Sequence, residues 1–251
     1  MNLLLVNDDG IDSPSLHTLA RAAKARGHHV LICAPSTQQS AKSHCFTIAT
    51  PLIAHPREVE YADEAWAVDG TPADCARLGL MALPEEKIDL VISGINVGYN
   101  AGLATFVSGT VGAAREAAFQ GVPAMAASAA PDVPAATLSL FAEWVVTVAE
   151  KLVHYPRPEL SVCNVNVPNV PVHGLKPPVL CPISRNVYRD SYVRGVSPRG
   201  LTYFWLTPEL PAEEHTPGSD LDWLDKGHIT MTFLTPEGCR QEDYQSLLDE
   251  L

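Results

Sequence analysis

Two adjacent carboxylates, Asp8 and Asp9, follow a short apolar run near the start of the chain, Leu3 to Val6. Neighbouring carboxylates repel one another unless a cation lies beside them, and hard oxygen ligands suit Mg²⁺ or Mn²⁺ better than a soft metal. Aspartate is also a common helix N-cap, so capping of the following helix explains one of the two residues. The pair alone leaves a divalent-metal site and helix capping as alternatives.

Two further turns place small and polar residues directly after or before regular elements. Asn96 follows the apolar run Asp89 to Ser93, and Ser108-Gly109-Thr110 precedes a strongly helical stretch. Backbone N–H groups at a helix N-terminus bind phosphate, which makes this second turn a candidate anion receptor. Serine and threonine are equally ordinary N-caps and glycine an ordinary turn former, so a purely structural role stays open.

The spacing of apolar residues predicts the elements that would position these side chains. A strand over Leu3 to Val6, a helix over Leu16 to Arg26 and a strand over Val30 to Cys33 form a βαβ unit. Short apolar strands between helices indicate a Rossmann-like α/β fold, with a mostly parallel sheet covered by helices on both faces. Ligands bind such sheets at the carboxyl ends of the strands, so Asp8, Asp9 and Asn96 are expected at one edge. The other predicted core elements are a strand at Asp89 to Ser93, a helix at about Thr110 to Gln120, a strand at Ala124 to Ser128 and a helix at Ala135 to Leu152.

The composition and pattern of the sequence change beyond about Pro156, where proline becomes frequent. Alternating segments at Ser161 to Val167, Leu201 to Leu206 and Ile229 to Leu234 predict extended strands and hairpins. No internal repeat or low-complexity linker separates this part from the rest. We therefore expect one α/β domain over residues 1–251, with a core at about 1–156 and a C-terminal elaboration at about 157–251.

Composition narrows the class of protein. The 251 residues are 46% hydrophobic with a mean hydropathy of +0.04, enough for a sizeable core, and 17 basic against 29 acidic residues give a net charge of -12. That charge argues against long nucleic acids as partners, and a small anion would need a local cation. The six cysteines form no CxxC pair, Met1 begins no signal peptide and no apolar run reaches membrane-spanning length. These features predict a cytoplasmic protein without a membrane partner.

Several better-known catalytic motifs are absent. The chain contains no GxSxG, Walker A or GxGxxG motif, and its nine histidines show neither HxxxH nor HxH spacing. His44 is interpreted as a surface or capped side chain rather than a catalyst. Thr71 followed by Pro72 is typical of an N-cap with proline in the first helical position, an arrangement that needs no ligand.

Several segments, in this order along the chain, together resemble the SurE survival-protein nucleotidases. The similarity is strong over roughly the first 130 residues and continues more weakly through NVNVP at 164–168 and Ser219-Asp220. The strong segments are LLVNDDGI at 4–11, the Ala34-Pro35 turn leading to Gln39-Ser40, GTPADC at 70–75, SGIN at 93–96 and SGTVGAA at 108–114.

The resemblance implies a reaction and a set of site residues. It implies hydrolysis of nucleoside 5'- and 3'-monophosphates with one divalent metal ion per subunit, Mg²⁺ or Mn²⁺. It also implies C-terminal strands and a helix that often exchange between subunits, giving a dimer or tetramer of this chain. The implied metal ligands are Asp8, Asp9, Ser40 and Asn96, of which Asp8 and Asp9 are also the catalytic residues, and the implied phosphate contacts are Asn96, Ser108, Gly109 and Thr110.

The chain departs from the family pattern at positions close to this chemistry. Ala41 stands where a glycine usually follows the ligand serine, and Val107 replaces a common tyrosine. Ala104 stands where many relatives carry an aspartate proposed for proton transfer, and Asp222 where some carry a histidine. We therefore assign no residue to proton transfer.

Three functional alternatives follow. The first is metal-dependent hydrolysis of a nucleoside monophosphate, in which metal-activated water attacks phosphorus while the Ser108-Gly109-Thr110 turn stabilises the developing charge. An aspartyl-phosphate on Asp8 is another route, but the DxDxT spacing is absent. The second alternative is a nucleotide-binding sensor or scaffold with weakened catalysis, motivated by Ala104. The third is a sugar-nucleotide glycosyltransferase, suggested by Gly27 to Val30 before a strand, for which the chain lacks a second Rossmann-like half.

Overall fold

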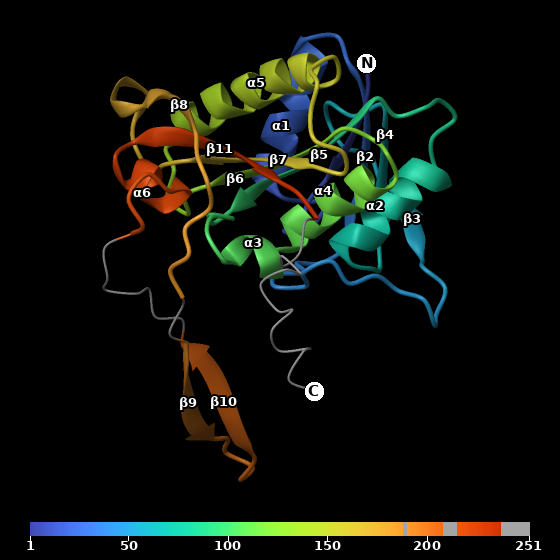
Figure 1. Cartoon of the computed structure of the whole chain (residues 1–251). Helices are drawn as coiled ribbons and strands as arrows, with labels where there is room; N and C mark the ends of the chain where they lie inside the picture. Colours follow the sequence, from blue (N-terminus) through green and yellow to red (C-terminus); the bar gives the residue numbers. More distant parts are fainter. Residues whose placement is uncertain (188–189, 208–214, 237–251) are drawn as a thin grey trace, which may run out of the picture.

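A nine-stranded sheet runs through the computed structural model, which describes residues 1–187, 190–207 and 215–236 (Figure 1). Its strands lie in the order β3-β4-β2-β1-β5-β6-β7-β11-β8. All neighbours from β4 to β7 are parallel, whereas β3 and β11 run antiparallel to β4 and β7, and β8 pairs parallel with β11. The bounds are β1 (Asn2–Val6), β2 (His29–Pro35), β3 (Ala54–Pro56), β4 (Glu64–Val68), β5 (Leu90–Val97), β6 (Ala124–Ala129), β7 (Val162–Val167), β8 (Lys176–Leu180) and β11 (His228–Leu234).

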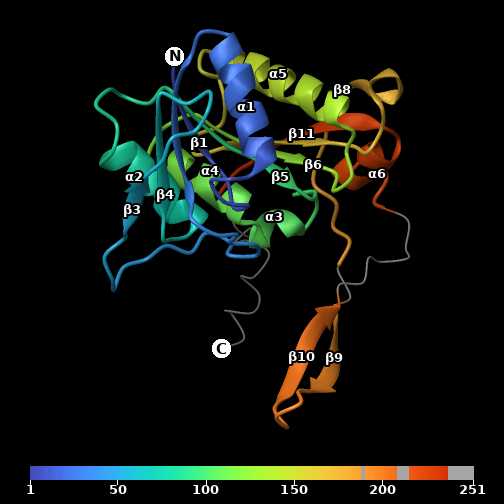
Figure 2. The same cartoon turned by 180° about the vertical axis from the view of Figure 1, so that it is seen from behind.

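Helices cover both faces of the sheet, as predicted. Helices α1 (Pro14–Ala25) and α5 (Ala135–Leu152) lie together on one face, and α2 (Pro72–Met81) and α4 (Gly109–Phe119) on the other (Figures 1 and 2). Strand β1 is buried on both sides because alternate side chains enter different cores: Leu3 and Leu5 pack with α1 and α5, and Leu4 and Val6 with α2 and α4. Among the described residues, no helix is both long and apolar enough to cross a membrane.

The strand order reverses its direction next to β1. The six parallel strands, read across the sheet as β4-β2-β1-β5-β6-β7, have the doubly wound order 3-2-1-4-5-6. The chain therefore winds outward in opposite directions from β1 and β5. Loops after these two strands diverge at their carboxyl ends, which is where open α/β sheets bind ligands.

The C-terminal part differs from its prediction in one respect. Strand β7, expected as part of an extended or hairpin region, is a parallel strand of the main sheet that is buried throughout. Its polar side chains are hydrogen-bonded inside the protein: Asn164 and Asn166 donate hydrogen bonds of 2.8 and 3.1 Å to the carbonyl oxygen of Asn100. Alternation of polar and apolar residues in this segment reflects a buried hydrogen-bond network rather than a solvent-exposed face.

The remaining elements lie outside the central layers or connect them. A hairpin of β9 (Ser191–Val196) and β10 (Thr202–Thr207) projects away from the body of the molecule (Figures 1 and 2). Three short helices, α3 (Ala104–Val107), α6 (Asp220–Asp225) and the 3-10 turn η1 (Val172–Gly174), complete the described structure. The predicted hairpin strand at Leu201 to Leu206 is confirmed as β10.

Candidate metal and phosphate site

Asp8 and Asp9 lie in a tight loop after β1 and not at the start of α1. Asn7 closes this loop, donating 2.8 Å to the carbonyl oxygen of Gly10 and accepting 3.2 Å from the Gly10 N–H. Gly10 has a φ of 101°, a left-handed conformation that glycine adopts without steric cost. The N-cap of α1 is Ser13, so the alternative that the aspartates cap this helix is wrong.

Asp8 lies against the N-terminus of α4. Its side chain is buried, and its Oδ1 accepts a hydrogen bond of 2.6 Å from the hydroxyl of Thr110. The close approach depends on Gly109, because a Cβ at that position would lie 3.1 Å from the Asp8 Cβ and 3.2 Å from its Oδ2. The carboxylate therefore lies at the positive end of the helix dipole, although it is 102 residues away in sequence.

Asp9 connects the ends of β1 and β5. Its Oδ2 accepts a hydrogen bond of 3.2 Å from the N–H of Val97, the last residue of β5. Asn96, the residue before, is half-buried, and its amide nitrogen donates 2.7 Å to the carbonyl oxygen of Gly98. The hydrogen bond between Asp9 and Val97 brings three predicted ligands, Asp8, Asp9 and Asn96, together at the carboxyl ends of β1 and β5.

The electrostatics of the two carboxylates are unfavourable without a cation. Burial raises the pKa of Asp8, the Thr110 hydroxyl opposes that shift and the charge of Asp9 adds to it. Burial also raises the pKa of Asp9, against hydrogen bonds from Val97 and Gln38. A divalent cation would relieve both the desolvation and the repulsion, and the hard oxygen donors fit Mg²⁺ or Mn²⁺.

Ser40 enters from the loop that follows β2. The N–H of Gln39 donates a hydrogen bond of 2.7 Å to the carbonyl oxygen of Asp8. Gln39, the residue before Ser40, therefore lies directly beside the site. Ser40 itself is exposed, and Ala41 after it has a left-handed φ of 57°. No cluster of three His, Cys, Asp or Glu side chains suited to a metal occurs in the described part of the chain. A cation at this edge would therefore need neutral oxygens beside its two carboxylates.

The Ser108-Gly109-Thr110 turn combines structural and electrostatic roles. Ser108 is the N-cap of α4, since its hydroxyl accepts 3.1 Å from the Val111 N–H. The Thr110 hydroxyl is used by Asp8. The Thr110 side chain thus joins the start of α4 to the carboxylate loop, a contact that sequence spacing did not predict, whereas Ser108 caps the helix itself.

Four of the other residues considered in the sequence take structural positions. Thr71 forms a capping box with Asp74 at the start of α2, as its sequence indicates. Ala104 begins α3 and carries no titratable group, while Asp222 accepts hydrogen bonds of 2.7 Å from both Gly218 and Lys226. His44 is half-buried, with Nε2 2.8 Å from a carboxylate oxygen of Glu116. The role of Glu116 was not predicted, since an isolated glutamate within a helix carries no local signal.

A pocket of about 330 Å³ adjoins the carboxylate loop on the β2 and β4 side of the sheet edge. Its volume falls at the lower end of the range for small-molecule sites. It is lined by Thr37, Gln39, Val68, Asp69, Gly70 and Thr71.

Comparisons with known proteins agree with this geometry. The model of the family described as Survival protein SurE matches residues 3–190. A protein named 5'-nucleotidase SurE from Solidesulfovibrio magneticus is 43% identical over 238 residues, covering 92% of this chain and 90% of that protein. A second with the same name, from Gloeobacter violaceus, is 39% identical over 234 residues, covering 92% and 89%.

A solved structure shares the fold. The crystal structure of a SurE protein from Aquifex aeolicus aligns with a TM-score of 0.80 and 30% identity, covering 98% of both chains. The similarity therefore extends through both the parallel core and the C-terminal elements.

Proposed function

The chain belongs to the Survival protein SurE family, and on that premise we propose that it is a 5'-nucleotidase. The reaction is hydrolysis of the phosphate monoester of a nucleoside 5'-monophosphate, which releases the nucleoside and phosphate, and we extend it to nucleoside 3'-monophosphates. The observation that carries the proposal is the meeting of Asp8 and Asp9 with the end of β5 and the start of α4 at the sheet edge beside β1.

One divalent cation per subunit, Mg²⁺ or Mn²⁺, is part of this proposal. Asp8 and Asp9 would hold it with their carboxylates, and Ser40 and Asn96 would add neutral oxygens. When bound, the cation supplies Lewis-acid polarisation of the phosphate and of the attacking water. The raised pKa values of the two aspartates support this role, because buried neighbouring carboxylates gain most from a bound cation.

The residues of α4 would bind and orient the phosphate. Gly109 and Thr110 present the first backbone N–H groups of an 11-residue helix, whose positive end faces the carboxylate loop. Ser108 caps the helix by accepting from the Val111 N–H, and Asn96 approaches from the end of β5. These donors would stabilise charge on the phosphoryl oxygens as it develops.

The test of this function is phosphate release by the full chain from a panel of nucleoside 5'- and 3'-monophosphates with Mg²⁺ or Mn²⁺. We expect Asp8→Asn to abolish metal-dependent release, because it removes one charged ligand from the site. Asp12→Asn is the matched control: this neighbouring carboxylate is exposed and pairs with Arg57 at 2.7 Å, so its loss should leave the rate unchanged. Near-normal turnover by Asp8→Asn would disprove the site assignment.

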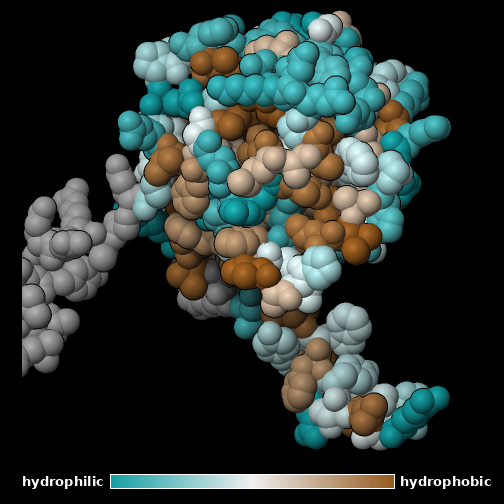
Figure 3. Space-filling model, turned by 90° about the vertical axis from the view of Figure 1, so that its right-hand side faces the viewer, coloured by the Kyte–Doolittle hydropathy of each residue, from teal (hydrophilic) through white to brown (hydrophobic). Residues whose placement is uncertain are grey.

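Self-association through the C-terminal hairpin is a further part of the proposal. The hairpin of β9 and β10 exposes large apolar side chains, including 67% of Tyr192, 61% of Phe204 and 70% of Trp205. Figure 3 shows some hydrophobic residues among hydrophilic ones on this projecting arm. Exposed apolar surface of this kind is typical of protein interfaces, and a second copy of the chain is its proposed partner. Light scattering should show a dimer or tetramer that Trp205→Glu dissociates; an unchanged mass would count against the hairpin.

We also propose that the protein acts in the cytoplasm. The described cysteines, Cys33, Cys45, Cys75, Cys163 and Cys181, are free thiols, which supports a reducing compartment. Fractionation of cells that express the native gene would test this assignment.

A further inference from the structure

The loop between Ser40 and Thr47 has no regular structure of its own. Both Ala41 and Ser43 have left-handed φ values, 57° and 53°, which non-glycine residues adopt at a steric cost. Its backbone lies directly on α4, since a Cβ at Gly112 would come within 2.1 Å of the Ser43 carbonyl oxygen. Tertiary contacts must therefore hold this loop in place.

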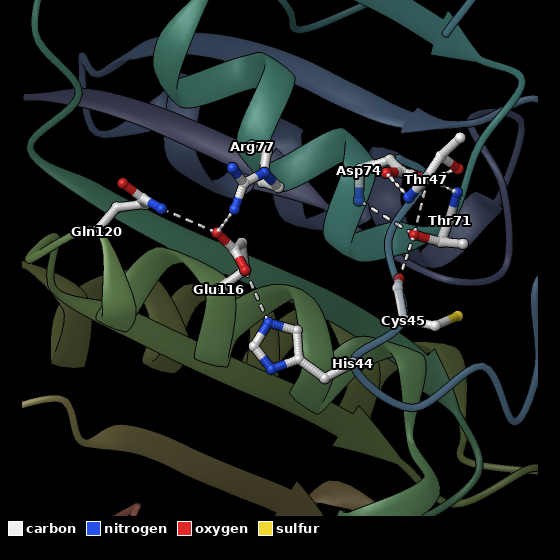
Figure 4. Close-up of polar contacts among 8 residues, drawn as sticks. All are labelled: His44, Cys45, Thr47, Thr71, Asp74, Arg77, Glu116 and Gln120. Carbon is white, nitrogen blue, oxygen red and sulfur yellow. Dashed lines mark hydrogen bonds and ion pairs between the residues drawn. The ribbon is translucent and has the colours of Figure 1, made fainter. Parts of the chain in front are cut away.

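The first of these contacts is a buried carboxylate on α4. Glu116 is 3% exposed, and its Oε2 lies 2.8 Å from His44 Nε2 (Figure 4). Its Oε1 accepts 2.7 Å from Arg77 on α2 and 3.0 Å from Gln120. Although burial opposes ionisation, the hydrogen bonds from Gln120 and His44 and the charge of Arg77 lower the pKa of Glu116. The loop is thus attached to an ionised group that both helices share.

The second contact is a buried carboxylate on α2. Asp74 is 1% exposed and accepts 2.7 Å from the N–H and 2.8 Å from the hydroxyl of Thr47. The capping residue Thr71 also donates 2.7 Å to the carbonyl oxygen of Cys45 (Figure 4). The same carboxylate that starts α2 therefore holds the far end of the loop.

The near end of the loop is held at the carboxylate site. Gln39, immediately before Ser40, donates to the carbonyl oxygen of Asp8, and Ser43 donates to the carbonyl oxygens of Val107 and Phe106 at 3.0 and 2.7 Å. Ser40 thus lies between a hydrogen bond to Asp8 on one side and a series of hydrogen bonds to α2, α3 and α4 on the other.

We propose that Glu116 and Asp74 are positioning residues, which act through His44 and Thr47 to hold Ser40 over Asp8 and Asp9. This inference rests on the proposed function, because Ser40 acts there as a metal ligand. Neither carboxylate touches substrate in this scheme. Groups that orient metal ligands in this indirect way typically contribute about 10- to 100-fold to metal affinity or activity.

The experiment measures Mn²⁺ binding to the full chain from the electron paramagnetic resonance signal of free Mn²⁺, together with kcat and KM for a nucleoside 5'-monophosphate. We expect His44→Ala to weaken Mn²⁺ binding by about tenfold and to lower kcat more than it raises KM. His44→Gln keeps an amide N–H that reaches Glu116, so it should restore binding to about twofold of the wild-type value.

The chain offers a matched control of the same chemical kind. His28 lies 3.0 Å from Glu150, which also binds Arg26, at the opposite end of the sheet where β2 begins. His28→Ala should reduce stability without changing Mn²⁺ affinity. Equal weakening by His28→Ala and His44→Ala would overturn the inference, because loss of stability alone would then explain both.

A smaller variant keeps the inference testable if His44→Ala does not fold. Thr47→Val removes one hydroxyl bond to Asp74 with little change in shape, and we expect Mn²⁺ binding about threefold weaker. Unchanged binding in Thr47→Val would then overturn the inference. A wild-type chain that neither binds Mn²⁺ nor releases phosphate would overturn the proposed function itself, whereas a normal wild type with an unaffected His44→Ala would overturn only the positioning role.

Discussion

The hydroxyl of Thr110 donates a hydrogen bond of 2.6 Å to Oδ1 of Asp8 and so joins α4 to the loop after β1. This bond opposes the rise that burial causes in the pKa of Asp8. Thr110→Val should therefore raise that pKa further, because the ionised form loses a donor. Since metal binding requires the carboxylate, the acid limb of the pH–rate profile should move to higher pH, with about tenfold less activity on that limb.

The control for this prediction is a buried threonine away from the site. Thr137 on α5 donates 2.8 Å to the carbonyl oxygen of Val170, and Thr137→Val should reduce stability without moving the acid limb. A Thr110→Val enzyme with a wild-type pH profile would show that the hydroxyl does not tune Asp8.

Asp8→Asn should stabilise the metal-free protein at neutral pH although it removes activity. The pKa of Asp8 in the folded protein is raised above its ordinary value of 3.8. The protonated side chain therefore contributes to the free energy of unfolding below pH 3.8, and this contribution is lost as the pH rises through the raised pKa. With the metal removed by EDTA, we expect a gain of about 1 kcal/mol near pH 7 that disappears in acid. Urea unfolding at both pH values measures it, and a gain independent of pH would contradict this explanation.

Gly109→Ala tests the close approach of α4 to Asp8. The new Cβ would lie 3.0 Å from Pro72 Cγ and 3.1 Å from Asp8 Cβ, so the helix start or the carboxylate must shift. Displacements of this order at a reacting centre lower activity by about tenfold or more. Steady-state phosphate release is the measurement. Gly174→Ala is the control, since its Cβ meets nothing closer than 3.6 Å; equal activity of the two variants would refute the argument.

Ala41→Gly should increase stability. Ala41 has a φ of 57°, a conformation that costs an L-residue about 1–2 kcal/mol, while the added flexibility of glycine in the unfolded chain costs about 0.5–1 kcal/mol. We expect a net gain of about 0.5 kcal/mol, seen as a higher Tm. Ala136→Gly, at an exposed position in α5, should instead lose stability, and a loss in both would contradict the assignment of strain to Ala41.

Much of the fold could be predicted because its signals are local. The apolar runs at β1, β2, β5 and β6 and the helical periodicity of α1, α4 and α5 lie within a few residues of their observed bounds. The short strand β4 and the antiparallel edge strand β3 were not predicted, since neither has a pattern long enough to distinguish it from a loop. The burial of Asn164 and Asn166 was not predicted, because their hydrogen-bond partner, Asn100, is far away in sequence.

The sequence by itself determined that Asp8 and Asp9 follow a buried strand, since that depends only on neighbouring residues and the parallel-sheet pattern. Only the tertiary structure decided what lies next to them: Val97 is 88 residues from Asp9 and Thr110 is 102 residues from Asp8. It also decided that Ser13, not either aspartate, caps α1. The reason is physical. Local periodicity specifies which faces are buried, whereas the pairing of β1 with β5 and the docking of α4 depend on long-range hydrogen bonds and packing that no short segment encodes.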